Sequence, residues 1–283
     1  MPPPSWPDLL QHCLNVSGPV PDIVRRRYAV LHNVTVSQEA LWHNGNSGRL
    51  AQQIACYYGL AARYQESGAT VCETGYNVGH SAVTFLSALN SPLARYVGFD
   101  LGQLRRLTWS SVNLLNRSFF PGQVTMTYGR STRTLPAFLA QHPTLRCDIL
   151  SIDGDHSLDG MRADWELLRA HTHANTTIFV DDIAFPMSMN RARVTSSVAV
   201  HTLFREYADL ELIGCARLRG LADAWADPGL ITAAPSSRRP GGYNEATGRA
   251  IRGLPASPGV CVARRRAAGP PEATAELAVG VAG

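Results

Sequence analysis

The sequence contains no lysine, because all 26 of its basic residues are arginine. This absence excludes a P-loop lysine, a pyridoxal phosphate enzyme that forms a Schiff base, and any lysine general base. No stretch of the chain approaches the roughly 18 apolar residues that a membrane-spanning helix needs. The net charge is only +4, and no basic face alternates with aromatic side chains. We therefore expect neither a membrane nor a nucleic acid as partner.

The six cysteines form no Cys-x-x-Cys pair, which argues against a zinc knuckle and a dithiol redox motif. Several of them lie in apolar runs, so we expect small buried side chains, a reducing compartment and a cytoplasmic protein. Four Asn-x-Ser/Thr sequons begin at Asn15, Asn33, Asn116 and Asn175. The first residues lack the basic region of a secretory signal, so we interpret the sequons as chance matches.

Strand-like apolar runs alternate with helical patterns through the middle of the chain. The runs that favour strands are 70–73, 96–100, 124–129, 147–153, 177–182 and 210–216. A further short run at 259–263 can pair antiparallel with 210–216. This order predicts an α/β, Rossmann-like, doubly wound fold with a mostly parallel seven-stranded sheet, an antiparallel edge strand and an N-terminal helical cap.

The same pattern divides the chain into segments. We expect an N-terminal cap or irregular segment at 1–45 and the core at 46–219. Alanine, glycine, proline and arginine dominate after residue 220, so 220–257 is either an insertion or disordered. The last two segments are a candidate final edge strand at 258–266 and a disordered tail at 267–283.

The strongest signal for a site is the sequence VCETGYNVGHSA from Val71 to Ala82. A short strand ends in Glu73, a loop runs from Gly75 to Gly79, and a helix follows. Glycines let the backbone approach a ligand closely, and the N–H groups of a helix N-terminus bind carboxylate or phosphate. Glu73 stands where a dinucleotide fingerprint has glycine, so its charge favours a cationic nucleoside over a pyrophosphate.

Acidic residues end three further strands. Asp100 ends the second strand, where an acid can accept hydrogen bonds from both ribose hydroxyls. Asp153, Asp181 and Asp182 end the fourth and fifth strands, whose carboxyl ends should meet at one edge. Three carboxylates repel one another unless a cation such as Mg²⁺ neutralises them. Taken singly, each Asp can also cap a helix, and His156 is either a base, a substrate contact or a hydrogen-bonding loop residue.

These motifs together resemble the class I S-adenosylmethionine-dependent methyltransferases, most closely the branch that includes the macrocin and aminocoumarin sugar O-methyltransferases. The resemblance extends from Ser47 to Ala216. The matching residues are Glu73-Thr74-Gly75, Asn77, Gly79, Ser81, Ala82, Gly98-Phe99-Asp100, Gly129-Arg130-Ser131, Ile152-Asp153-Gly154-Asp155-His156, Asp164 and Val180-Asp181-Asp182. Arg130 departs from the family pattern, which often has an acid before the serine.

The resemblance implies methyl transfer from S-adenosylmethionine to a hydroxyl group of a small-molecule acceptor. It implies that the glycine loop holds the methionine part of the cofactor, that Asp100 holds the ribose and that Ser131 lies near the adenine. The cofactor-binding residues carried over are Glu73, Gly75, Asn77, Gly79, Ser81, Asp100, Ser131 and Asp153.

In the metal-using members of this family, acids that match Asp153, Asp181 and Asp182 hold a divalent cation, and the first also acts as a base. The resemblance therefore makes Asp153 a catalytic candidate, and His156 is the second. The sequence leaves open whether a cation is required and whether the chain forms a homodimer.

Two other functions stay open at this point. Asp153-Gly154-Asp155 is a D-x-D motif, which metal-dependent glycosyltransferases use to hold a nucleotide diphosphate. A catalytically inactive nucleoside-binding module with the same fold is the third candidate. Binding of a UDP-sugar in place of S-adenosylmethionine distinguishes the glycosyltransferase from the methyltransferase.

Overall fold

The computed structural model describes residues 20–35, 51–103, 105–155, 157–181, 202–217, 242–244, 249–251 and 259–265. Its strands are β1 (Thr70–Thr74), β2 (Arg95–Asp100), β3 (Val124–Tyr128), β4 (Cys147–Ile152), β5 (Thr172–Val180), β6 (Leu210–Arg217), β7 (Gly242–Asn244), β8 (Arg249–Ile251) and β9 (Gly259–Arg265). Its longer helices are α2 (Asp22–Thr35), α3 (Ala51–Ala61), α4 (His80–Leu89), α5 (Arg105–Leu114), α6 (Ser131–Gln141) and α7 (Leu158–Leu168). Shorter helical turns follow three of these helices at Ala62–Tyr64, Leu115–Phe119 and Arg169–His171.

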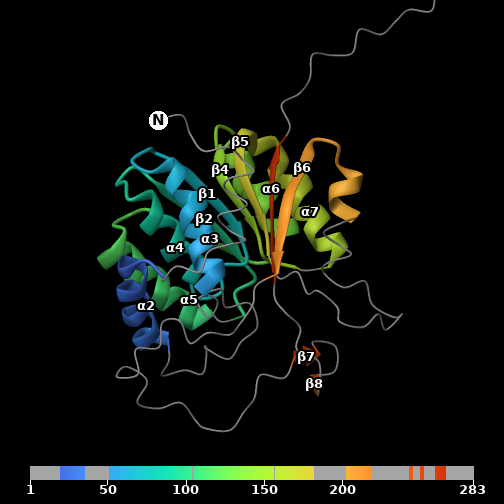
Figure 1. Ribbon diagram of the computed structural model, residues 1–283. Helices are drawn as coiled ribbons and strands as arrows, with labels where there is room; N and C mark the ends of the chain where they lie inside the picture. The colour runs from blue at the N-terminus through green and yellow to red at the C-terminus, as the bar shows by residue number, and fades with distance from the viewer. Residues whose placement is uncertain are drawn as a thin grey trace, which may run out of the picture.

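Seven strands form one sheet in the order β3-β2-β1-β4-β5-β9-β6 (Figure 1). The first five strands in this order are parallel, and β9 runs antiparallel to both β5 and β6. This confirms the predicted fold and the antiparallel pairing of 259–263 with 210–216. The expectation that 258–266 is the edge strand is wrong, because β9 lies between β5 and β6 and β6 forms the edge.

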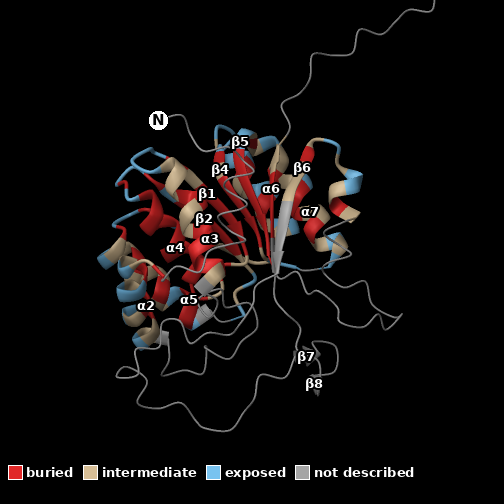
Figure 2. Cartoon of the chain, viewed as in Figure 1, coloured by how far each residue is buried: buried red, intermediate tan, exposed pale blue. Residues whose placement is uncertain are grey.

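Helices cover both faces of the sheet, with α2 to α5 on one side and α6 and α7 on the other (Figure 1). Successive residues of a strand point to opposite faces. Val71 therefore belongs to the core that includes α3 and α4, whereas Cys72 belongs to the core that includes α6 and α7. The central strands β1, β2, β4 and β5 are buried along most of their length (Figure 2). This burial holds the carboxyl ends of the parallel strands in fixed relative positions.

The expected N-terminal cap contains one described helix, α2, which packs against α4 and α5. The Tyr28 hydroxyl donates to the backbone oxygen of His80 at 2.9 Å, and the Tyr28 ring meets the imidazole edge to face. Tyr28 therefore anchors α2 to the first turn of α4. Segment 220–257 lies largely outside the described residues, and so does 267–283. In the part of the chain that the structure describes, no helix has the length and apolar character to span a membrane.

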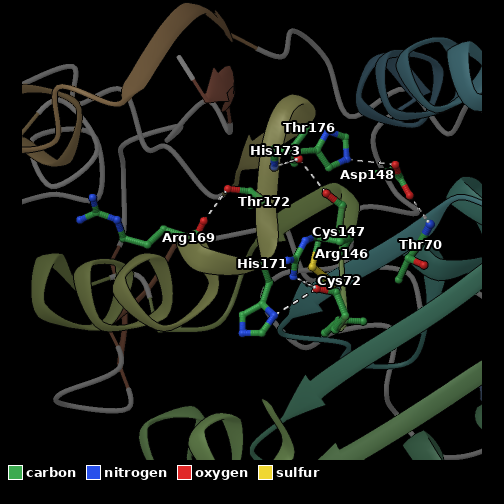
Figure 3. The surroundings of a disulfide bond; sticks show 11 residues. Thr70, Cys72, Arg146, Cys147, Asp148, Arg169, His171, Thr172, His173 and Thr176 are labelled. Carbon is green, nitrogen blue, oxygen red and sulfur yellow. Dashed lines mark hydrogen bonds and ion pairs between the residues drawn. A yellow bond between two sulfur atoms is a disulfide. The ribbon is translucent and has the colours of Figure 1, made fainter. Parts of the chain in front are cut away.

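Cys56, Cys72, Cys147 and Cys261 are buried, as predicted, but the expectation of reduced thiols is wrong for these four. Cys72 and Cys147 form a disulfide that joins β1 to β4 (Figure 3). Cys56 and Cys261 are disulfide-bonded as well. The sequence gives no spacing signal for these bonds, because the sheet brings together cysteines that lie 75 residues apart.

Candidate active site

The pairing of the parallel strands continues one residue beyond their carboxyl ends. Four backbone N–H groups donate to carbonyl oxygens of the neighbouring strand, at N···O distances from 2.7 to 3.1 Å. From β5 to β2, this row contains Asp181, Asp153, Gly75 and Asp100, and Gly129 follows β3 one position further along. The prediction that the strand-end acids lie at one edge is confirmed for Asp153 and Asp181. This edge is where open parallel sheets bind ligands.

Gly75 and Gly79 shape the loop between β1 and α4. Both have positive φ angles, of +91° and +87°. A Cβ atom on Gly75 would lie 1.9 Å from the carbonyl oxygen of Asp153, so only glycine lets the loop pass this close to β4. Gly79 is the N-cap residue of α4 and provides no side-chain cap, which leaves backbone N–H groups of the first turn pointing out of the helix. Such N–H groups bind a carboxylate or a phosphate.

Asp100 links the end of β2 to this loop. Its Oδ2 accepts a hydrogen bond from the backbone N–H of Asn77 at 2.8 Å, and its Oδ1 accepts one from Gly102 at 2.6 Å. Each carboxylate oxygen keeps a second lone pair, so the fixed Asp100 can still accept from two ribose hydroxyls. The two bonds hold the carboxylate in one orientation beside the glycine loop.

Replacing Asp100 with alanine should weaken S-adenosylmethionine binding by about 1.5–3 kcal/mol, which is the usual value of hydrogen bonds to a charged group. Titration calorimetry measures this loss as roughly a 10- to 100-fold higher Kd. The matched control is Asp159→Ala, because Asp159 is an exposed acid on α7 whose partner is Arg162. An unchanged Kd for the Asp100 variant would remove Asp100 from the site.

Glu73 is completely buried beneath the loop, and its pKa differs from that of an exposed glutamate. Its Oε2 accepts hydrogen bonds from Ser81 Oγ at 2.7 Å and from the Tyr96 hydroxyl. Burial raises the pKa of Glu73 to about 7, although the hydroxyls of Tyr96, Ser81 and Ser151 oppose the shift. Glu73 and Ser81, both expected to hold the cofactor, thus belong to one buried hydrogen-bond network at the base of the loop.

This pKa predicts a specific dependence of stability on pH. Between pH 4.5 and about 7, the folded protein keeps the proton of Glu73 while the unfolded chain has lost it. The free energy of unfolding therefore falls as pH rises through this window, by about 3 kcal/mol in total. Glu73→Gln mimics the protonated form and should flatten the dependence. Thermal melts of both proteins from pH 4.5 to 8 test this, and parallel profiles would contradict it.

The Asp181 carboxylate is hydrogen-bonded to two side chains of the same helix. Its Oδ2 accepts hydrogen bonds from the Tyr57 hydroxyl at 2.8 Å and from the Gln53 amide, both on α3. Burial raises the pKa of Tyr57, and the nearby carboxylates of Asp181 and Asp153 raise it further. Among the described residues, no group of three His, Cys, Asp or Glu side chains could hold a metal ion. The expected metal triad is thus not found there, and Asp182 lies outside the described residues.

Asp164 occupies a buried position under the site, and the sequence did not assign it a role. A Cβ on Gly154 would lie 3.3 Å from Asp164 Oδ2. Burial raises the pKa of Asp164, and the hydroxyls of Ser131 and Thr74 lower it in part. Asp164 therefore lies among the ends of β1 and β4 and the start of α6, where Ser131 is the first residue. Asp164 matches the family pattern, and the signal that could have indicated a role for it is an acid on the otherwise apolar buried face of α7.

The structure thus brings together most of the predicted cofactor residues and one catalytic candidate. Glu73, Gly75, Asn77, Gly79 and Ser81 lie on β1, the loop and α4. Asp100 joins them from β2, Ser131 starts α6, and Asp153 follows β4. His156 lies outside the described residues, in the short connection between β4 and α7.

Comparison with known proteins gives one match to a family model and several to solved structures. Residues 72–183 match the family model described as a methyltransferase domain. No curated protein sequence is significantly similar to the chain.

Three solved structures are similar over almost the whole chain. The O-methyltransferase TomG from Streptomyces achromogenes, in complex with SAM, has 15% identity and a TM-score of 0.59, with 94% of this chain and 100% of TomG covered. The O-methyltransferase from Bacillus cereus, in complex with SAH, has 13% identity and a TM-score of 0.53, with 92% and 98% covered. SAH-bound PaMTH1 from Podospora anserina has 12% identity and a TM-score of 0.53, with 92% and 94% covered.

At these identities the structural likeness establishes the fold and leaves the acceptor open. The residues that match the family model include the glycine loop, Asp100 and Asp153. Residues 72–183 thus match a methyltransferase domain, and the chain has the Rossmann-like fold of these O-methyltransferase structures.

Proposed function

We propose that the chain transfers a methyl group from S-adenosylmethionine to a hydroxyl oxygen of a small molecule. The observation that carries the proposal is the hydrogen-bonded row at the carboxyl edge, where Asp100 and the glycine loop fix each other. The O-methyltransferases TomG and that of Bacillus cereus have the same fold and bind SAM and SAH, respectively. We propose SAM as the cofactor on these grounds.

The residues of the edge suit the chemistry of this cofactor. The N–H groups at the start of α4 complement the carboxylate of its methionine part, and Asp100 complements the ribose. Glu73 adds negative potential below the loop in the fraction of molecules in which it is ionised, which favours a cation. Ser131, at the start of α6, would lie near the adenine.

When bound, S-adenosylmethionine supplies a methyl group on a positively charged sulfur, which an acceptor oxygen displaces in line. The contribution of the chain is then to hold the acceptor oxygen in line and to accept the proton of the hydroxyl group. Asp153 is the proposed proton acceptor, because it follows β4 beside Gly75 and its side chain is partly exposed. His156 is the alternative acceptor, three residues further along the chain.

The described residues do not favour a metal in this step. A cation on Asp181 would compete with the hydrogen bonds from Tyr57 and Gln53, which both use Oδ2. We therefore propose that a side chain, and not a divalent ion, assists the loss of the hydroxyl proton.

Chelation of metal ions distinguishes proton transfer to a side chain from a metal-assisted reaction. Methyl transfer should keep its rate in excess EDTA, because the proposed proton acceptor is a side chain. Asp181→Asn should lower stability by about 1–3 kcal/mol, since it leaves the buried contacts of Tyr57 incomplete, and added Mg²⁺ should not restore the lost stability. Loss of activity in EDTA that Mg²⁺ or Mn²⁺ restores would re-establish the metal mechanism.

The glycosyltransferase alternative gains no support from the D-x-D motif. Asp155 is exposed, and its Oδ1 accepts a hydrogen bond from the backbone N–H of Ser157 at 3.0 Å. Ser157 in turn caps α7 by accepting from Gly160. Asp155 thus serves the turn that starts the helix.

The proposed reaction is tested with methyl-labelled S-adenosylmethionine and a panel of phenols and sugars. We expect label in an ether product and stoichiometric S-adenosylhomocysteine. Label that appears only on nitrogen or sulfur acceptors would overturn the choice of oxygen.

A further inference from the structure

The oxidation state of the cysteines indicates where this chain folds. The four cysteines whose side chains the structure describes, namely Cys56, Cys72, Cys147 and Cys261, are each in a disulfide. Reducing compartments keep thiols free, and disulfides of this kind are typical of secreted proteins and of the lumen of the secretory pathway. The reducing, cytoplasmic compartment expected from the sequence is therefore at odds with these bonds.

The Cys72–Cys147 bond must form during folding. Both residues are completely buried within the core that includes α6 and α7. Figure 3 shows the bond lying between β1 and β4. Thiol–disulfide exchange requires access to the sulfur atoms, and neither sulfur is accessible in the folded chain. The oxidant must therefore be present while the sheet assembles, which excludes oxidation of the finished protein.

The same compartment gives the sequons a function that the methyltransferase reaction does not use. Asn33 lies in the last turn of α2 and is exposed, and its sequon ends with Thr35. Asn175 is also exposed, near the start of β5, and its sequon ends with Thr177. The start of β5 is at the opposite end of the strand from Asp181, so a glycan on Asn175 leaves the carboxyl edge accessible.

A third sequon provides an internal contrast. Asn116 is partly buried, and its Nδ2 donates to the Val124 carbonyl oxygen at 2.8 Å. Its Oδ1 accepts from the Val124 N–H at 2.9 Å. A sugar on Nδ2 would need room beside the backbone of Val124, where this pair of hydrogen bonds joins the helical turn after α5 to β3. Asn33 and Asn175 are thus accessible to a glycosylating enzyme, whereas the side-chain amide of Asn116 is already hydrogen-bonded within the fold.

We propose that Asn33 and Asn175 carry N-linked glycans and that Asn116 does not, in a chain that matures in an oxidising compartment. The donor is a lipid-linked oligosaccharide diphosphate. A bond forms between Asn Nδ2 and the anomeric carbon of the sugar, and the bond from that carbon to the diphosphate oxygen breaks. The lipid diphosphate leaves, and Nδ2 releases one proton. Each disulfide forms as two thiols give two electrons and two protons to a disulfide-bearing oxidant, which becomes a dithiol.

The test uses the full chain isolated from its native cells, with free thiols alkylated at lysis. A peptide N-glycosidase in heavy-oxygen water converts each glycosylated Asn to labelled Asp, which peptide mass spectrometry locates. We expect label at Asn33 and Asn175, none at Asn116, and a peptide pair linked through Cys72 and Cys147 before reduction. Absence of label at Asn33 or Asn175, label at Asn116, or alkylated Cys72 and Cys147 would each overturn the corresponding assignment.

Matched variants separate glycan loss from misfolding. Expressed through a secretory pathway, Asn33→Gln and Asn175→Gln should each lose the mass of one glycan and keep the wild-type affinity for S-adenosylmethionine. Asn116→Gln should keep the wild-type glycan mass but melt at a lower temperature, because the contact with Val124 is altered. If Asn116→Gln is the variant that loses a glycan, the proposal is wrong. These readouts do not depend on the methyl-transfer reaction.

Discussion

Alanine in place of Gly75 is expected to weaken S-adenosylmethionine binding by more than about 100-fold, because small displacements of a binding loop have effects of this size. The new Cβ would lie 1.9 Å from the Asp153 carbonyl oxygen, so the loop or the end of β4 must move. The φ angle of +91° adds backbone strain for any residue with a side chain. Together these costs should lower the free energy of unfolding by about 2–5 kcal/mol.

Gly122→Ala is the matched control for this experiment. Gly122 also has a positive φ angle, of +70°, but a Cβ there would meet nothing within 4 Å. In the Gly122→Ala variant, backbone strain alone should lower the free energy of unfolding, by about 1–2 kcal/mol, and the affinity for S-adenosylmethionine should be unchanged. Kd values from calorimetry and thermal melts of both variants distinguish the effect of the steric clash with Asp153 from that of the backbone strain. Equal losses of affinity in the two variants would show that the close approach to Asp153 is unimportant.

Asparagine in place of Asp153 is expected to lower kcat by about 10²- to 10⁴-fold, which is the usual contribution of a general base. The change keeps the size of the side chain and the backbone hydrogen bond from Asp153 to Thr74 at 2.9 Å. The loop geometry and the cofactor Kd should therefore change little. Single-turnover methyl transfer at saturating cofactor, with the best acceptor from the panel, measures the effect directly.

The neighbouring Asp155→Asn variant is the control, because Asp155 is exposed and bonds to the turn before α7. It should retain nearly all of the activity. If Asp153→Asn is as active as wild type, His156 becomes the leading proton acceptor, and His156→Gln should then show the large loss.

Much of the fold could be predicted because each element has a local signal. The apolar runs at 124–129 and 147–153 match β3 and β4 to within one residue, and the helix expected directly after Gly79 is α4. Parallel pairing then places strand-end residues at one edge, so the predicted neighbours Asp153 and Asp181 could be identified from topology alone. The position of β9 between β5 and β6 depends on a long connection that has no periodic pattern.

The parts of the site that the sequence did not reveal depend on contacts between distant segments. The hydrogen bonds that Asp181 accepts are donated by Gln53 and Tyr57, which lie more than 120 residues earlier in the chain. The Cys72–Cys147 disulfide likewise joins residues with no motif in common. The pKa of Glu73 depends on burial under α4 and on the Tyr96 hydroxyl, which no local pattern encodes.

Titration calorimetry of the full chain with S-adenosylmethionine decides whether the carboxyl edge of the sheet is a cofactor site. We expect one binding site for S-adenosylmethionine and competition by S-adenosylhomocysteine. In Asp100→Ala, binding should be 10- to 100-fold weaker, which corresponds to a loss of about 1.5–3 kcal/mol. Gly75→Ala should show no measurable heat under the same conditions. Binding of a UDP-sugar with Mn²⁺, together with no heat from S-adenosylmethionine in the folded wild type, would contradict the account.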